Sequence, residues 1–166
     1  METQKIIILA IVTLLSIAVS LTIQQYFLKK ARAQLDKNII NLALAIVYAF
    51  TIVGFFVLNI KAIFVLEEYI DIIFKVTETE GLPTIAKTSA VFIAIINLWM
   101  IINFFFTRIL MIVFYGKRNR PIEIANNNYP YFLLEGTILI GMIGSLLPIF
   151  EIILHIFFPV EVPFYR

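Results

Sequence analysis

The sequence contains no cysteine, only one histidine and few charged residues, and each shortage excludes a class of protein. A chain without cysteine forms no disulfide, has no thiol nucleophile and holds no cysteine-ligated zinc. One histidine excludes a multi-histidine metal site within a single protomer, so we expect no metal. Only 14% of the 166 residues are charged, against about 25% in soluble domains. Too few polar side chains are present to cover a water-soluble globule, which excludes a soluble enzyme as the leading class.

The sequence motifs of common enzymes are absent too. There is no P-loop, no glycine-rich dinucleotide-binding turn, no His-Glu-x-x-His and no Gly-x-Ser-x-Gly. No pair of aspartates lies within the apolar runs, as an intramembrane aspartyl peptidase would require. The net charge of +2 is too small to indicate nucleic-acid binding. We therefore expect a protein that is not an enzyme, carries no cofactor and binds no nucleic acid.

Long apolar runs are what the sequence has in abundance. Hydrophobic residues make up 61% of the chain, and the mean hydropathy is +0.98. A helix crosses the bilayer core with about 20 apolar residues, and four runs are long enough to do so. The fourth run contains Glu151, which we interpret as a buried acid inside a longer span. We expect a single all-α integral membrane domain, a four-helix bundle with transmembrane helices at residues 6–28, 38–60, 84–115 and 131–158.

The segment that follows the second span is amphipathic. Glu67, Asp71 and Lys75 recur at every fourth position of residues 62–76, while apolar side chains supply the rest of the surface. We predict a short outer amphipathic helix, which either lies in the membrane interface or extends the second span beyond the membrane. Glycine and proline then indicate a turn over residues 77–87, before the third span.

Basic residues concentrate in two of the connecting segments. Eight of the 13 lysines and arginines lie between the first two spans or around the end of the third, where Gly116 is expected to end the helix and residues 116–130 form a polar connector. Since short cytoplasmic loops carry an excess of Lys and Arg, we place both segments in the cytoplasm and both termini outside. We expect a multi-pass protein of a prokaryotic plasma (inner) membrane, with an organelle membrane as the alternative.

Seven of these cations are predicted to form one basic patch. Such a patch binds anionic lipid headgroups or a soluble, acidic cytoplasmic protein. The predicted patch consists of Lys29, Lys30, Arg32, Arg108, Lys117, Arg118 and Arg120.

One face of the fourth span carries small, polar or helix-perturbing residues at helical spacing. Thr137, Gly141, Gly144 and Pro148 lie on it, followed by Glu151 and His155. Membrane helices associate through small residues and interhelical hydrogen bonds. We therefore predict that this helix-packing face points into the bundle or toward a second copy of the chain. The first span has a similar but weaker polar stripe, formed by Thr13, Ser16, Ser20 and Gln24.

Glu151 and His155 are four residues apart, so their side chains can meet on the helix. Residues expected at a similar outer depth are Asn59, Lys61 and Asn97, and together the five could line a small polar cavity that binds a proton or cation. The alternative, which we favour, is that Glu151 pairs with Lys61 or His155 and holds the helices together. Glu135, near the cytoplasmic boundary, is expected to reach solvent by snorkelling.

Three functions follow from these patterns. The leading one is a non-catalytic multi-pass membrane subunit that oligomerises or holds a partner protein or anionic lipid through its basic cytoplasmic loops. The alternative is a small oligomeric ion or proton channel or transporter that uses Glu151. The third is a lipid-modifying membrane enzyme, for which the sequence offers no evident nucleophile.

Overall fold

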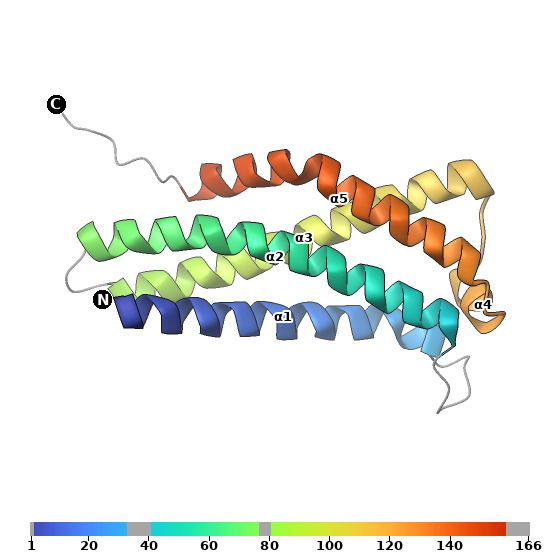
Figure 1. Cartoon of the computed structure of the whole chain (residues 1–166), viewed down its shortest axis with the longest axis horizontal. Coiled ribbons are helices and arrows are strands. Elements are labelled where there is room, and N and C mark those ends of the chain that lie inside the picture. The colour runs from blue at the N-terminus through green and yellow to red at the C-terminus, as the bar shows by residue number, and fades with distance from the viewer. Residues whose placement is uncertain (1, 33–40, 77–80, 159–166) are drawn as a thin grey trace.

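The computed structural model describes residues 2–32, 41–76 and 81–158, and within these ranges the regular elements are all helices. The four long helices are apolar enough to cross a membrane, so the protein is an all-α, multi-pass membrane bundle (Figure 1). A fifth, short helix connects the third and fourth of them. The helices are α1 (Glu2–Arg32), α2 (Leu42–Val76), α3 (Gly81–Tyr115), α4 (Arg120–Ala125) and α5 (Tyr129–Phe157).

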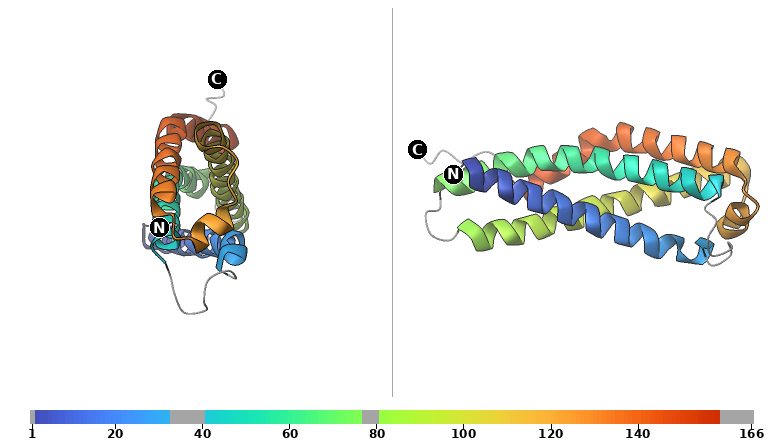
Figure 2. Two further views of the ribbon diagram at one scale, coloured as in Figure 1. Left: turned by 90° about the vertical axis from the view of Figure 1, so that its right-hand side faces the viewer. Right: turned by 60° about the horizontal axis from the view of Figure 1, so that its bottom comes forward.

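Helix α2 organises the bundle, because it packs against each of the other three long helices. Its most extensive contact is with α5, while α1 packs on the other side of the bundle, against α2 and α3 (Figures 1 and 2). The short helix α4 lies at one end of the molecule and contacts α1. We call this end of the bundle the α4 end.

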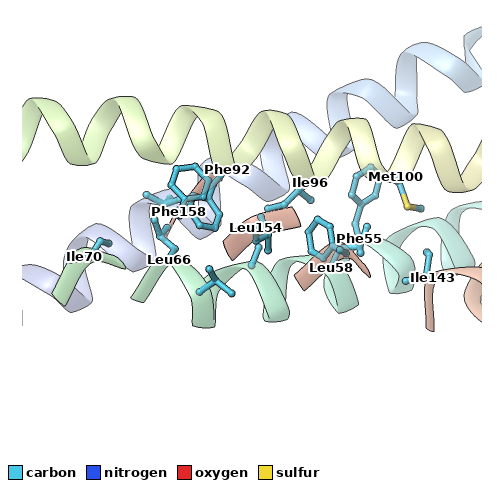
Figure 3. Close-up of a cluster of buried hydrophobic side chains, with 14 of the residues drawn as sticks. Phe55, Leu58, Leu66, Ile70, Phe92, Ile96, Met100, Ile143, Leu154 and Phe158 are labelled. Atoms are coloured by element: carbon cyan, nitrogen blue, oxygen red, sulfur yellow. The ribbon is translucent and has the colours of Figure 1, made fainter. Parts of the chain in front are cut away.

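Large apolar side chains fill the interior of the bundle (Figure 3). Leu58, Phe92, Met100 and Phe150 are almost completely buried, and the ring of Phe150 stacks on Trp99 with 5.7 Å between ring centroids. Lipid tails are as apolar as these side chains, so their transfer from lipid to the interior gains little. The interior is instead stabilised by close packing and dispersion.

The helix boundaries refine the prediction at three places. Helix α2 continues without a break through residues 62–76. Of the two alternatives for this segment, the structure therefore favours an extension of the second span over a separate helix in the membrane interface. Helix α3 begins at Gly81, so the turn predicted up to residue 87 is wrong; Pro83 fits the first helical turn, where its missing N–H is not needed. Gly116, with a φ of +76°, ends α3 as predicted.

Two exposed cations on α3 bracket a stretch without charged residues. Lys87 and Arg108 are both exposed on α3 and lie about 32 Å apart along the helix at 1.5 Å per residue. The hydrocarbon core of a bilayer is about 30 Å thick. The charge-free stretch of α3 between these two cations is therefore long enough to cross that core.

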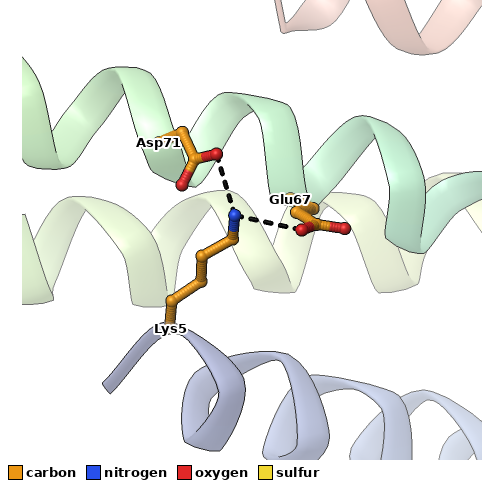
Figure 4. A network of polar contacts seen from close by, with 3 residues as sticks. All are labelled: Lys5, Glu67 and Asp71. Carbon is orange, nitrogen blue, oxygen red and sulfur yellow. Dashed lines mark hydrogen bonds and ion pairs between the residues drawn. The ribbon is translucent and has the colours of Figure 1, made fainter. Parts of the chain in front are cut away.

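At the end opposite α4, an ion-pair network attaches the start of α1 to α2 (Figure 4). The Lys5 ammonium lies 2.8 Å from the Asp71 carboxylate and 3.0 Å from the Glu67 carboxylate. Its side chain is only 13% exposed, whereas the two acids are about half-exposed. The acidic face predicted for residues 62–76 is thus a docking face for the first helix.

Candidate functional site

A cavity of about 500 Å³ lies at the α4 end of the bundle. This volume lies in the range of about 300–1,000 Å³ that is typical of sites for small molecules. All five helices contribute to its wall. The apolar part consists of Ile23, Leu28, Val47, Phe55, Met100, Ile101, Phe104, Phe105, Pro121 and Ile124, and the polar part of Gln24, Thr51, Arg108, Asn119, Arg120 and Glu135.

The divergence of α1 and α3 explains where the cavity lies. In Figure 1 the two helices separate toward the α4 end, and α4 lies between their ends. The right-hand view of Figure 2 shows that they cross near their middles. The cavity residues of α1 and α3 come from the halves of these helices nearest α4. Ile101 and Phe105 also belong to the outer surface of α3, at 41% and 62% exposure. The cavity wall is therefore continuous with the lipid-facing surface of the bundle.

A largely buried ion pair joins α4 to α5 in the cavity wall. The Arg120 guanidinium lies 3.3 Å from the Glu135 carboxylate, and the two side chains are 22% and 10% exposed. The guanidinium also lies over the ring of Phe132, 5.8 Å from its centroid. Charges taken out of water require such partners, because desolvation disfavours them strongly. The prediction that Glu135 reaches solvent is therefore wrong, since Arg120 folds back onto it.

Two buried polar atoms of the cavity residues have no hydrogen-bond partner within the described part of the chain. One is Oε1 of Gln24, a residue that is 4% exposed and whose Nε2 donates to the Tyr48 carbonyl at 3.5 Å. The other is Nε of Arg120. Buried polar atoms are generally hydrogen-bonded. Neither atom is accessible to water, so both are enclosed by neighbouring groups rather than open to the cavity.

The predicted basic patch gathers at the α4 end, but not all of it faces outward. Lys29, Arg108, Lys117 and Arg118 are exposed, and Arg118 is 3.3 Å from the Glu123 carboxylate. Arg120 instead turns into the bundle, as its pairing with Glu135 shows. Lys30 and Arg32 lie in the last turns of α1, and their side chains are outside the described part of the structure.

The five residues predicted to share a polar cavity around Glu151 separate into two sets. Glu151 pairs with Lys61 across α5 and α2 at 3.5 Å, the contact that the favoured alternative proposed. His155 lies one turn beyond Glu151 and is partly buried. Asn59 and Asn97 instead turn toward α1 and are buried there. The prediction of a single cavity lined by all five residues is therefore wrong.

Helix α1 presents its polar stripe to the bundle, as predicted. The Ser16 hydroxyl donates to the Asn59 side-chain oxygen at 2.5 Å, and the Ser20 hydroxyl donates to that of Asn97 at 3.2 Å. Both serines and Gln24 are buried, while Thr13 is partly buried. The stripe forms a polar seam that leads along α1 to the cavity.

The small-residue face of α5 points out of the bundle. Thr137, Gly141, Gly144 and Pro148 are all exposed, and a Cβ atom added at either glycine would have no neighbour within 4 Å. The prediction that this face packs within one chain is therefore wrong, because bulky side chains at other positions fill the core instead. Contact of this face with a second copy stays a prediction.

Close helix approach occurs at a glycine that the sequence pattern did not single out. A Cβ atom at Gly136 of α5 would lie 2.3 Å from the ring of Phe50 on α2. Gly136 follows Glu135, so this contact of the Phe50 ring with α5 lies next to a residue of the cavity wall. The only sequence signal for this close contact is a small residue next to an acidic one near the start of a span.

Comparison with known proteins adds no functional assignment. No protein-family model, no curated protein and no solved structure matches this chain. The cavity, its buried ion pair and the charge distribution of the bundle are therefore the features from which its function is inferred.

Proposed function

We propose that the chain is a non-catalytic multi-pass membrane subunit that binds an anionic amphiphile in the cavity at its α4 end. One observation carries the proposal: the lining of the cavity is mostly apolar and includes two arginines, Arg108 and Arg120. Apolar walls accommodate an acyl or similar chain. Arginine is well suited to phosphate and carboxylate headgroups, because its planar guanidinium donates charge-assisted hydrogen bonds.

The position of the cavity favours a ligand that comes from the bilayer. Ile101 and Phe105 line it and are also exposed on the lipid-facing side of α3. Arg108 is exposed about two turns before the end of α3, and a long arginine side chain near the end of a span reaches lipid headgroups by snorkelling. A lipid can therefore place its chain against the apolar wall while its head stays at the membrane surface.

The polar residues of the cavity favour binding over catalysis. The Thr51 hydroxyl already donates to the Val47 carbonyl at 2.7 Å, and Glu135 is engaged by Arg120. Neither residue has the arrangement of an activated nucleophile next to a free general base. The lipid-modifying enzyme therefore gains no support from this site.

Self-association is the second part of the proposed function. The outward orientation of Gly141 and Gly144 favours it, because their exposed backbone allows another helix to approach closely. The pairing of Glu151 with Lys61 supports a structural role for this acid, so no observation favours the channel over the subunit. A soluble acidic partner at the basic loops, a prokaryotic inner membrane and outside termini remain parts of the proposal.

Retention of lipid by the purified protein tests the proposal. The protein is purified in a mild detergent, incubated with equal amounts of an anionic and a zwitterionic lipid, and examined by native mass spectrometry. Wild type is expected to retain the anionic lipid, and Arg108→Gln to retain about fivefold less, since a basic residue near the membrane surface contributes ~1 kcal/mol to this attraction.

Lys117→Gln is the matched control for this experiment. Lys117 is an exposed cation at the same end of the bundle, but it does not line the cavity. It should retain lipid as wild type does. Equal loss in both variants would mean that the surface patch and not the cavity attracts the lipid, and the proposed function would then be wrong.

A further inference from the structure

The cavity is closed at the end that lies farthest from α4, and this limits the length of the tail that it admits. We infer that the ligand is an anionic amphiphile with a medium-length tail of about ten carbons, whose end contacts Met100 and Phe55. The inference rests on the proposed function and narrows its ligand from any anionic amphiphile to a medium-chain one.

The residues that line the cavity span the same length on two helices. On α2 they run from Val47 to Phe55, and on α3 they run from Arg108 to Met100. The members of each pair are eight residues apart, which corresponds to about 12 Å along a helix. Helix α2 begins and α3 ends at the α4 end (Figure 1), so Phe55 and Met100 lie at the far end of the cavity.

Met100 closes the far end between α2, α3 and α5. A Cβ atom added at Gly54 of α2 would lie 3.0 Å from the methyl carbon of Met100 and 2.7 Å from a methyl carbon of Ile143 on α5. Met100 is fully buried, and with Phe55 it belongs to the cluster of apolar side chains that fills the interior beyond the cavity (Figure 3). A tail that lies between these helices therefore ends at the Met100 side chain.

A hydrogen bond closes the gap between α1 and α3 at the same depth. The Ser20 hydroxyl donates to the Asn97 side-chain oxygen at 3.2 Å, and both residues are buried. Ser20 lies about one turn beyond Gln24, and Asn97 lies about one turn beyond Met100, on the side away from α4. The two helices cross near their middles in the right-hand view of Figure 2. This crossing prevents a tail from continuing along α1.

The depth of the cavity corresponds to a tail of medium length. An extended alkyl tail advances ~1.2 Å per bond, as an extended backbone does with ~3.5 Å over three bonds, so about ten carbons span the ~12 Å between the levels of Arg108 and Met100. Along this path the Thr51 hydroxyl donates to the Val47 carbonyl, and the unpartnered oxygen of Gln24 is enclosed. Longer tails would have to displace packed side chains, and overpacking an interior is unfavourable.

A competition between tails of different length tests the inference. Lysophosphatidylglycerols with decanoyl and hexadecanoyl tails have the same anionic head and differ only in length. Native mass spectrometry of wild type in a mild detergent with an equal mixture should show the decanoyl compound in about fivefold excess, because the additional carbons cannot enter the packed interior without strain.

The other outcomes separate the inference from the proposed function. Equal retention of both compounds, or an excess of the hexadecanoyl compound, would overturn the inference. The proposed function would stay intact if both were retained above the lysophosphatidylcholines with the same tails. Retention of neither above its lysophosphatidylcholine would overturn both.

Variants assign the limit to Met100. In a series of even-numbered tails, Met100→Ala should move the best-retained tail from decanoyl to dodecanoyl or tetradecanoyl, because truncating the side chain leaves a cavity at the far end. Met111→Ala is the matched control, since Met111 is an equally buried methionine of α3 that does not line the cavity; it should keep the decanoyl maximum. A Met100→Ala protein that elutes as folded and keeps the wild-type maximum would contradict the inference. The wild-type competition decides on its own if that variant does not fold.

A photoreactive group at the end of the tail locates the tail directly. Decanoyl lysophosphatidylglycerol with a terminal diazirine should label Phe55 and Met100 at the far end of the cavity. Labels on Phe105 and other exposed residues of α3 instead would mean that the tail leaves the cavity sideways for the bilayer, and the inference would then be wrong.

Discussion

Arg120, the first residue of α4, and Glu135 of α5 form an ion pair whose guanidinium and carboxylate are 3.3 Å apart. The pair attaches the short connecting helix to the bundle and forms part of the wall of the cavity at the α4 end. It therefore links the stability of the α4 end to the site that we assign to an anionic lipid. Variants of Arg120 and Glu135 test this ion pair separately from the other cations of the basic patch.

Removing one partner of this pair should be more harmful than removing both. Arg120→Gln leaves the Glu135 carboxylate buried without a cation, which costs about 3 kcal/mol for buried pairs. Arg120→Gln combined with Glu135→Gln should recover most of that loss, because two neutral amides can hydrogen-bond each other. Reversible unfolding in mixed micelles measures both. A double variant that is no more stable than the single one would show that loss of the ion pair does not cause the destabilisation of Arg120→Gln.

The seam between α1 and α2 should show measurable coupling. Ser16 donates to Asn59 inside the bundle at 2.5 Å. A double-mutant cycle with Ser16→Ala and Asn59→Ala is expected to give a coupling energy of about 0.6 kcal/mol, the average for interhelical hydrogen bonds in a membrane protein, and no more than about 1.7 kcal/mol. Ser145→Ala, on the exposed surface of α5, serves as the control and should couple to neither. A coupling energy of zero would show that this hydrogen bond does not contribute to the stability of the bundle.

Alanine substitutions at the glycines of α5 should change the stability of the bundle differently, depending on where each glycine points. Gly136→Ala places a methyl group against the Phe50 ring and should destabilise the bundle by about 2 kcal/mol through overpacking. Gly141→Ala meets nothing within the chain and should leave the stability unchanged or raise it by up to about 1 kcal/mol. Unfolding in micelles compares the two. Equal destabilisation by both variants would mean that the face of α5 is assigned incorrectly.

Self-association through the exposed face of α5 makes a different prediction for bulky side chains. Gly141→Leu with Gly144→Leu should weaken the oligomer about tenfold or more, because the large side chains prevent close helix approach. Sedimentation equilibrium in detergent measures the dissociation constant. Leucines at Thr22 and Ala18, exposed on α1, are the matched control and should not change it. A wild-type protein that is monomeric at every concentration would remove the oligomer from the proposal.

Much of the fold follows from the sequence because the membrane restricts what a chain can do. Only helices satisfy every backbone hydrogen bond within one segment in lipid, so a charge-free run of 20 or more residues predicts a spanning helix. The end of α3 at Gly116 and the inward polar stripe of α1 were predictable for the same local reasons. Neither depends on the relative placement of distant segments.

The cavity and the inner face of α5 were not predictable, because they depend on how whole helices cross. Helical spacing identifies the face that carries Gly141 and Gly144, but core packing decides which face points inward. The large residues around Ile143 and Phe150 fill the interior instead. The pairing of Arg120 with Glu135 likewise requires α4 to fold back, which no local pattern in the connector indicates.

Photo-crosslinking tests the central claim most directly. Phosphatidylglycerol with a photoreactive group near its head is incorporated into bilayers containing the wild-type protein, and the labelled residues are mapped by peptide mass spectrometry. Labels are expected to concentrate on the cavity wall at Leu28, Ile101 and Phe104, and to fall several-fold in Arg108→Gln. Labels spread equally over exposed positions at the same depth that are outside the cavity, such as Leu133 and Ile109, would contradict an internal lipid site.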